Sequence, residues 1–110
     1  MAYDEGLAQR MRECLEDEPA VVEKKMFGGL CFMIRGHMAA GIVGDELMVR
    51  VGPDAYEKCL ALPHAREMDF TGRSMKGMVY VRPAGFRTKA SLERWVGRGL
   101  SFVKCLPAKG

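Results

Sequence analysis

Residues Lys24 to Val51 of this 110-residue chain read KKMFGGLCFMIRGHMAAGIVGDELMVRV and give the clearest indication of its fold. Gly36-His37 and Gly44-Asp45 each separate short apolar runs. Glycine at the first of the two central positions is typical of a type II′ hairpin, because glycine adopts a positive φ without strain. The stretch therefore predicts three consecutive antiparallel strands, preceded by a backbone bend at Gly28-Gly29.

Two-residue turns at these positions would also set the register of the strands. Arg35 would pair with Met38 and Val43 with Glu46, and the strand periodicity would then assign a core face. The residues expected on that core face are Cys31, Met33, Arg35, Met38, Ala40, Ile42, Leu47, Val49 and Val51.

The opposite face of the same strands would carry four apolar side chains. These form a candidate protein interface, made of Leu30, Phe32, Ile34 and Val43. A sheet face of this kind is rarely left bare, so we expect it to be covered by another element of the chain or by a second copy. In the second case the protein is a homodimer with two-fold symmetry.

The flanking sequence predicts the remaining elements from periodicity, caps and breakers. They are a helix over Asp4 to Glu16 capped by Asp4, a strand over Val21 to Met26, a short helix after Gly52-Pro53, strands at 67–70 and at Gly77 to Arg82, and a helix from Thr88 to Lys104. This order predicts a two-layer α+β fold, in which about three helices cover an antiparallel sheet of about six strands. The length favours one domain over residues 1–110.

Composition excludes several classes of protein. The chain is 48% hydrophobic and 28% charged, as in ordinary globular domains, and it contains no apolar membrane-spanning run. Its first residues show neither the basic nor the apolar region that is typical of a secretory leader. We therefore expect a cytoplasmic protein with no membrane association. The four cysteines form no CxxC pair, which favours free thiols over a metal site, and no motif calls for a cofactor.

Charge is distributed unevenly along the chain. Residues 1–23 carry a net charge of −5 and residues 64–110 carry +7. This polarity indicates either attraction between the two ends of the chain, which we favour, or a positive surface offered to an acidic partner. The second interpretation gives six candidate anion or nucleic-acid contacts, of which the first two belong to an expected loop over Thr71–Lys76: Arg73, Lys76, Arg87, Lys89, Arg94 and Arg98.

No catalytic constellation is visible in the sequence. Gly28-Gly29 lacks the GxGxxG and GK[ST] patterns of phosphate-binding loops, and it precedes a strand instead of a helix. His37 and His64 have no serine or cysteine placed so as to form a nucleophile–base pair. We therefore expect a protein that is not an enzyme, with no catalytic residues to name.

Two motifs point to a known family: Met26-Phe27-Gly28-Gly29, and Met75-Lys76-Gly77 followed by an alternating strand. With the closing amphipathic helix, they make the chain, from its first helix to Leu106, resemble the N-terminal domain of the TfoX/Sxy family of bacterial competence regulators. The resemblance implies an α+β domain with an antiparallel sheet. In the full-length regulators a helical C-terminal domain follows, and the protein acts with the cyclic-AMP receptor protein to switch on competence genes. Because the sequence ends at Gly110, we expect a stand-alone copy of the module.

The leading hypothesis for function is a non-enzymatic module that binds a protein partner in transcriptional control. It rests on the resemblance and on the surplus apolar face of the predicted sheet. An alternative is direct binding of nucleic acid by the basic half, residues 64–110. A further alternative is a small-molecule sensor or an uncharacterised enzyme, with Gly28-Gly29 and the Arg73–Lys76 segment as its only sequence support.

Overall fold

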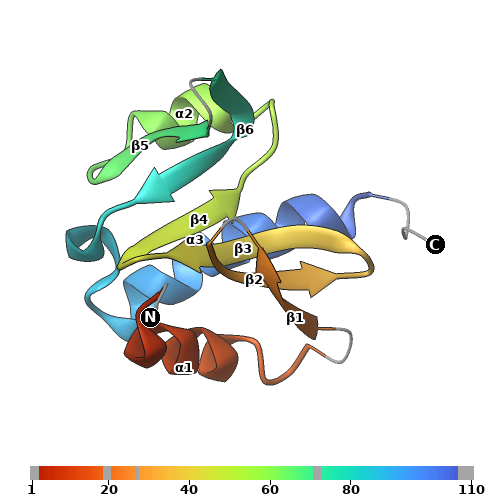
Figure 1. The fold of residues 1–110 in the computed structure, drawn as a ribbon. Coiled ribbons are helices and arrows are strands. Elements are labelled where there is room, and N and C mark those ends of the chain that lie inside the picture. The colour runs from red at the N-terminus through yellow and green to blue at the C-terminus, as the bar shows by residue number, and fades with distance from the viewer. Residues whose placement is uncertain (1–2, 19–20, 27, 71–72, 107–110) are drawn as a thin grey trace.

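A single antiparallel sheet organises the protein. The computed structural model describes residues 3–18, 21–26, 28–70 and 73–106, without the side chains of residues 26, 68–70 and 73–76. Its elements are α1 (Glu5–Cys14), β1 (Val21–Met26), β2 (Gly29–Ile34), β3 (His37–Val43), β4 (Glu46–Arg50), α2 (Tyr56–Leu60), β5 (Ala65–Phe70), β6 (Arg73–Val81), the 3-10 helix η1 (Pro83–Phe86) and α3 (Lys89–Lys104). The strand order is β1-β2-β3-β4-β6-β5, with every neighbouring pair antiparallel (Figure 1).

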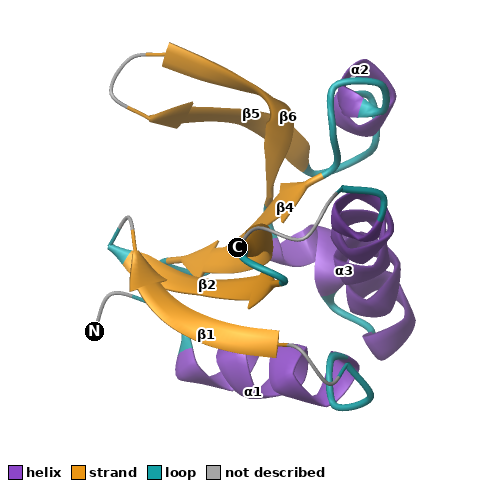
Figure 2. Ribbon diagram, turned by 90° about the vertical axis from the view of Figure 1, so that its right-hand side faces the viewer, coloured by secondary structure: helices purple, strands orange, loops and turns teal. Residues whose placement is uncertain are grey.

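The helices lie together on one side of this sheet (Figure 2). Helix α3 packs against β3 and β4, α2 packs against β5 and β6, and α1 lies beside α3. The predicted α+β fold is therefore confirmed. None of the helices within the described residues combines the length and the apolar character that crossing a bilayer requires.

The two long helices begin where the sequence predicts, because both have side-chain caps. Asp4 accepts hydrogen bonds from the backbone N–H groups of Gly6 (2.8 Å) and Leu7 (3.2 Å) at the start of α1. Thr88 and Ser91 form a reciprocal capping box at the start of α3. The apolar stripe of α3 is buried, and its fully covered members are Leu92, Trp95, Val96, Gly99 and Val103.

The second predicted hairpin is confirmed. Val43 pairs with Glu46 across a two-residue turn whose first residue, Gly44, has a φ of 60°. The carbonyl of Gly44 also accepts a hydrogen bond from the backbone N–H of Asp4 (2.8 Å). The β3–β4 turn therefore holds the segment that leads into α1.

The first predicted hairpin is wrong by one residue. Its turn consists of Arg35 and Gly36, whose φ values of 54° and 85° are those of a type I′ turn. Ile34 consequently pairs with His37, in place of the expected pair of Arg35 with Met38. Type I′ geometry has a twist that matches that of the flanking strands, so an arginine in the left-handed region is tolerated here.

A β-bulge changes the register a second time: Phe32 pairs with Ala40 and Met33 with Met38, so Ala39 of β3 has no partner in β2. Beyond it Leu30 pairs with Ile42, so these two residues share a face of the sheet. The side-chain period of a strand is two residues, and a net shift of one residue therefore moves the side chains of β2 to the opposite face.

The candidate interface predicted from the sequence does not form a common surface. Leu30, Phe32 and Ile34 are 3%, 1% and 1% exposed and lie in the core beneath the helices. Only Val43 lies on the other side of the sheet, where it is partly buried. The prediction of an apolar face made of these four residues is therefore wrong, and a homodimer through that face loses its basis.

The face of the sheet that points away from the helices, here called the outer face, is rich in sulfur. Cys31 and Met48 are completely buried there, and Met48 occupies the space over Gly41, where a Cβ atom would lie 2.7 Å from its terminal methyl group. The remaining members of this cluster are Met33, Met38, Val43, Met78 and Tyr80. Figure 2 shows that the sheet is strongly bent, which allows these side chains to cover one another. Cys31, Met33 and Met38 are thus on the side opposite to the one predicted.

The charge asymmetry was expected to reflect attraction between the acidic and the basic end of the chain, and one described salt bridge joins these two ends. Lys104, at the end of α3, pairs with Glu18, so the basic end of the chain meets the acidic end. Arg10 of α1 donates from Nη2 to the backbone carbonyl of Phe86 (2.6 Å). The other two described salt bridges, Arg12–Glu23 and Arg66–Glu46, do not join residues 1–23 to residues 64–110.

Two glycines of α3 have opposite surroundings. A Cβ atom built on Gly99 would lie 2.2 Å from the backbone oxygen of Ala39, so only glycine lets the helix sit this close to β3. A Cβ atom on Gly97 would meet no atom within 4 Å. Glycine inside a helix is less favourable than alanine.

We therefore predict that alanine has opposite effects at these two positions. Gly97→Ala should raise the free energy of unfolding by about 0.5–1 kcal/mol through helix propensity. Gly99→Ala should lower it by about 1–3 kcal/mol, because α3 must move away from the sheet. Urea unfolding of both variants measures the difference. Equal effects at the two sites would contradict the close packing of α3 against β3 at Gly99.

A second prediction tests the corrected register of β2. Phe32→Ala should lower the free energy of unfolding by about 3–5 kcal/mol, because it leaves a cavity in the core. Val22→Ala on β1, where the side chain is 54% exposed, should change it by less than about 0.5 kcal/mol. If Phe32→Ala were as mild as Val22→Ala, Phe32 would not lie in the core.

Candidate functional site

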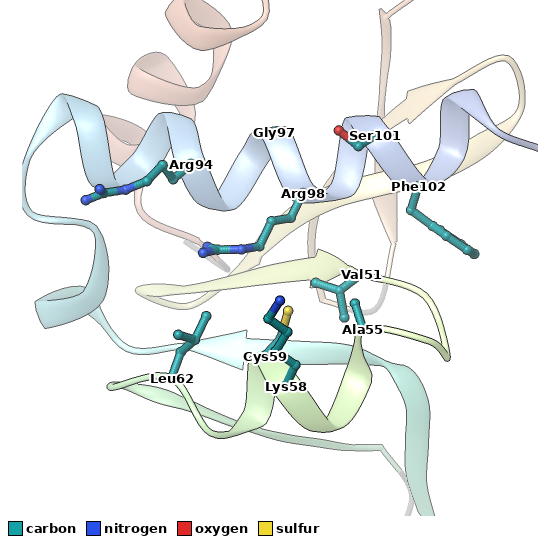
Figure 3. A pocket seen from close by; sticks show the side chains of 10 residues that line it. All are labelled: Val51, Ala55, Lys58, Cys59, Leu62, Arg94, Gly97, Arg98, Ser101 and Phe102. Atoms are coloured by element: carbon teal, nitrogen blue, oxygen red, sulfur yellow. The ribbon is translucent and has the colours of Figure 1, made fainter.

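A groove between α2 and α3 is the candidate site. Its volume is about 700 Å³. Figure 3 shows α3 along one side of it and α2 along the other. The ten described residues that line this α2–α3 groove are Val51, Ala55, Lys58, Cys59 and Leu62 from the α2 side, and Arg94, Gly97, Arg98, Ser101 and Phe102 from α3.

The groove exists because the two helices pack on different strands. Helix α3 lies over β3 and β4 and α2 over β5 and β6, while β4 and β6 are neighbours in the sheet. The chain turns from β4 toward α2 at Gly52, whose φ is 87°. A Cβ atom at Gly52 would lie 2.4 Å from the ring of Phe102, so glycine allows Phe102 to pack over this turn.

Hydrogen bonds hold the same turn in place. The backbone N–H groups of Val51 and Gly52 both donate to the carbonyl of Gly77 in β6, at 2.8 and 3.0 Å. The guanidinium carbon of Arg50 lies 5.4 Å from the ring centroid of Phe102. The end of the groove formed by Val51 and Phe102 is therefore tied to the sheet.

Three cationic side chains surround the groove: Lys58, Arg94 and Arg98. The guanidinium carbon of Arg98 lies 4.4 Å from the ring centroid of Trp95, which is buried. Stacking on an aromatic face orients a guanidinium group and leaves its N–H groups at the edge available. Figure 3 shows Lys58 and Arg98 pointing into the space between the helices. Within the described part of the chain, no carboxylate forms a salt bridge with any of the three.

Cys59 supplies the only thiol among the ten described residues that line the groove, and it is 4% exposed. Burial raises its pKa, and the positive charges of Arg98 and Lys58 partly oppose that shift. Because a thiol and not a thiolate is then the dominant form near neutral pH, Cys59 acts as part of the apolar lining.

This arrangement suits a ligand that is both apolar and anionic. Val51, Ala55, Leu62 and Phe102 give the apolar surface, and the cations stand beside it. A volume of this size lies within the range of small-molecule sites. Across residues 3–18, 21–26, 28–70 and 73–106, no three His, Cys, Asp or Glu side chains gather as a metal site would require.

The structure brings together two of the six basic residues predicted from the sequence. Arg94 and Arg98 line the groove, whereas Lys89 is exposed at the first turn of α3. Arg87 is exposed beside a separate hollow of about 480 Å³. The side chains of Arg73 and Lys76 lie outside the described residues, but their backbone belongs to β6, so the expected loop is strand from Arg73 onward.

The separate hollow beside Arg87 differs from the groove in its electrostatics. It contains the acids Asp4 and Asp45 together with Arg10, and Arg10 already donates to the carbonyls of Phe86 and Arg87. The guanidinium group of Arg10 is therefore already hydrogen-bonded within the protein. The α2–α3 groove is therefore the better site for an added anion.

The half of the groove that comes from α2 was not predicted from the sequence. Lys58 and Leu62 gave no signal in the sequence, because their position opposite Arg98 depends on β4 being next to β6. A signal did exist in α3. Arg94, Gly97, Arg98 and Ser101 follow one another at helical spacing on the side that its apolar stripe leaves uncovered.

Comparison with known proteins identifies the family. The family model of the TfoX N-terminal domain matches residues 13–103, which include all ten residues of the groove. A search of curated proteins and a search of solved structures each gave no match. The match covers most of the chain, and it agrees with the resemblance in the sequence and with the α+β fold of the structure. This chain belongs to the TfoX N-terminal domain family.

Proposed function

We propose that this protein is a non-enzymatic regulatory module that acts by binding a protein partner. The observation that carries the proposal is the family match over residues 13–103, which points at the family level to regulation of the competence type. On this proposal, the protein regulates the transcription of competence-type genes.

The geometry supports binding as the mode of action. The α2–α3 groove is formed by regular elements that pack on the sheet, so its shape exists before any partner arrives. Lys58, Arg94 and Arg98 are available to a partner, because no described carboxylate pairs with them. Preformed surfaces of this kind lose little conformational freedom on binding, which favours affinity.

A second candidate is direct binding of nucleic acid, and one observation favours it. Arg94 and Arg98 lie one helical turn apart on α3, and Arg87 and Lys89 are exposed near the start of the same helix. Basic side chains such as these can contact phosphates, and the affinity would fall steeply with rising salt. The apolar floor of the groove has no role in that mode, so protein binding remains our principal proposal.

The proposal predicts a defined effect in living cells. Deleting the gene should change the transcripts of a competence-type gene set, and a plasmid copy of the wild-type chain should restore them. The same chain, immobilised, should retain a specific protein from extracts of that cell. RNA sequencing and mass spectrometry measure the two results. Unchanged transcripts, together with no reproducibly retained protein, would refute the proposal.

Controls separate protein binding from nucleic-acid binding. Nuclease treatment of the extract should leave the retained protein in place. Labelled duplex DNA should bind the chain weakly or not at all at physiological salt. Retention that disappears after nuclease treatment would support the second candidate instead.

A further inference from the structure

We infer that the α2–α3 groove binds an acidic, amphipathic segment of the partner protein, in which carboxylates flank an apolar side chain. This inference rests on the proposed function and names the chemistry of the partner. Three properties of the groove carry it: its uncompensated charge, its apolar floor and its extent along α3.

Charge is the first property. Lys58, Arg94 and Arg98 contribute three positive groups, and none of the ten lining residues is acidic. Guanidinium groups bind carboxylates through two parallel hydrogen bonds, and the stacking of Arg98 on Trp95 presents such an edge. An anionic occupant therefore finds complementary charge here, whereas a cationic one is repelled.

The apolar floor is the second property, and it separates a peptide from a nucleic acid. Val51, Ala55, Leu62 and Phe102 lie among the cations and present carbon atoms to the groove. A phosphate backbone would neutralise the charges but would leave this surface without contacts. A peptide segment with an apolar side chain between carboxylates satisfies both parts of the groove at once.

Extent is the third property. A further hollow of about 350 Å³ shares Leu62, Arg94 and Arg98 with the groove and continues it toward His64. At Gly97 the α3 backbone carries no side chain, and the space there is open. The surface thus follows α3 for more than the length of one side chain, which suits a peptide segment better than a single small anion.

The experiment measures binding of a fluorescein-labelled peptide of about twelve residues, in which Asp and Glu alternate with Leu and Phe at helical spacing. Two comparison peptides replace either every acid by its amide or every apolar residue by serine. Fluorescence anisotropy with the full chain should show the acidic amphipathic peptide binding at least about tenfold more tightly than either comparison peptide, and more weakly as salt rises.

Variants locate the binding. Arg94→Glu together with Arg98→Glu should weaken binding by about tenfold or more, because the groove then repels the peptide. Lys24→Glu together with Lys25→Glu makes the same change of charge on the exposed edge strand β1 and should leave the affinity within about twofold. Circular dichroism checks that both double variants are folded.

Gly97 offers a pair of variants in which loss of stability cannot explain the result. Gly97→Ala and Gly97→Glu both replace a helical glycine by a residue of higher helix propensity. Only Gly97→Glu adds a carboxylate among the cations of the groove, where it competes with the peptide. Gly97→Glu should therefore weaken binding severalfold more than Gly97→Ala does.

Each result distinguishes an acidic peptide segment from other possible ligands of the α2–α3 groove. Equal affinity for the three peptides, or equal effects of the two double variants, would overturn the inference. The same holds if a labelled DNA duplex binds more tightly than the acidic peptide and loses affinity in the Arg94/Arg98 variant. If the chain retains a cellular partner that the Arg94/Arg98 variant also retains, the inference fails while the proposed function stands. If no partner is retained and no transcript changes, the proposed function fails whatever the peptides show.

Discussion

The structure depends on the close contact between α3 and the sheet. Gly99 brings the helix against the backbone of Ala39, and this approach places Leu92, Trp95 and Val96 in the core. The rotation of α3 about its axis is then fixed, because one stripe of the helix is buried. The same rotation directs Arg94 and Arg98 into the groove beside α2. The core packing of α3 therefore also sets the positions of these two cations.

Local signals in the sequence predicted the helices and strands, but they did not predict the register in which β2 and β3 pair. Caps and apolar periodicity predicted α1 and α3, and Gly44-Asp45 correctly predicted the β3–β4 turn. The β2–β3 turn differed because Arg35-Gly36 adopts a type I′ turn, which needs a positive φ at an arginine. The bulge opposite Phe32, which leaves Ala39 of β3 without a partner in β2, is likewise not encoded by any local pattern. Together they exchanged the two faces of β2, and the predicted interface became part of the core.

The candidate site could be predicted only in the part that one helix supplies. Arg94 and Arg98 are one helical turn apart, so the sequence places them on a common face. Lys58, Val51 and Leu62 join them through the neighbouring positions of β4 and β6, and this adjacency is a property of the whole sheet. Lys89 lies about 140° around α3 from Arg94, and Arg87 precedes the helix, so both lie outside the groove although they are near Arg94 in sequence.

Binding in the groove between α2 and α3 can be observed residue by residue. The measurement is a titration of the ¹⁵N-labelled chain with the acidic amphipathic peptide, in which the amide resonances are followed. The largest shifts should arise at Lys58, Cys59, Arg94, Gly97 and Arg98, while the amides of β1 should stay unchanged. Shifts concentrated on the outer face, around Met48 and Tyr80, would contradict binding in the groove.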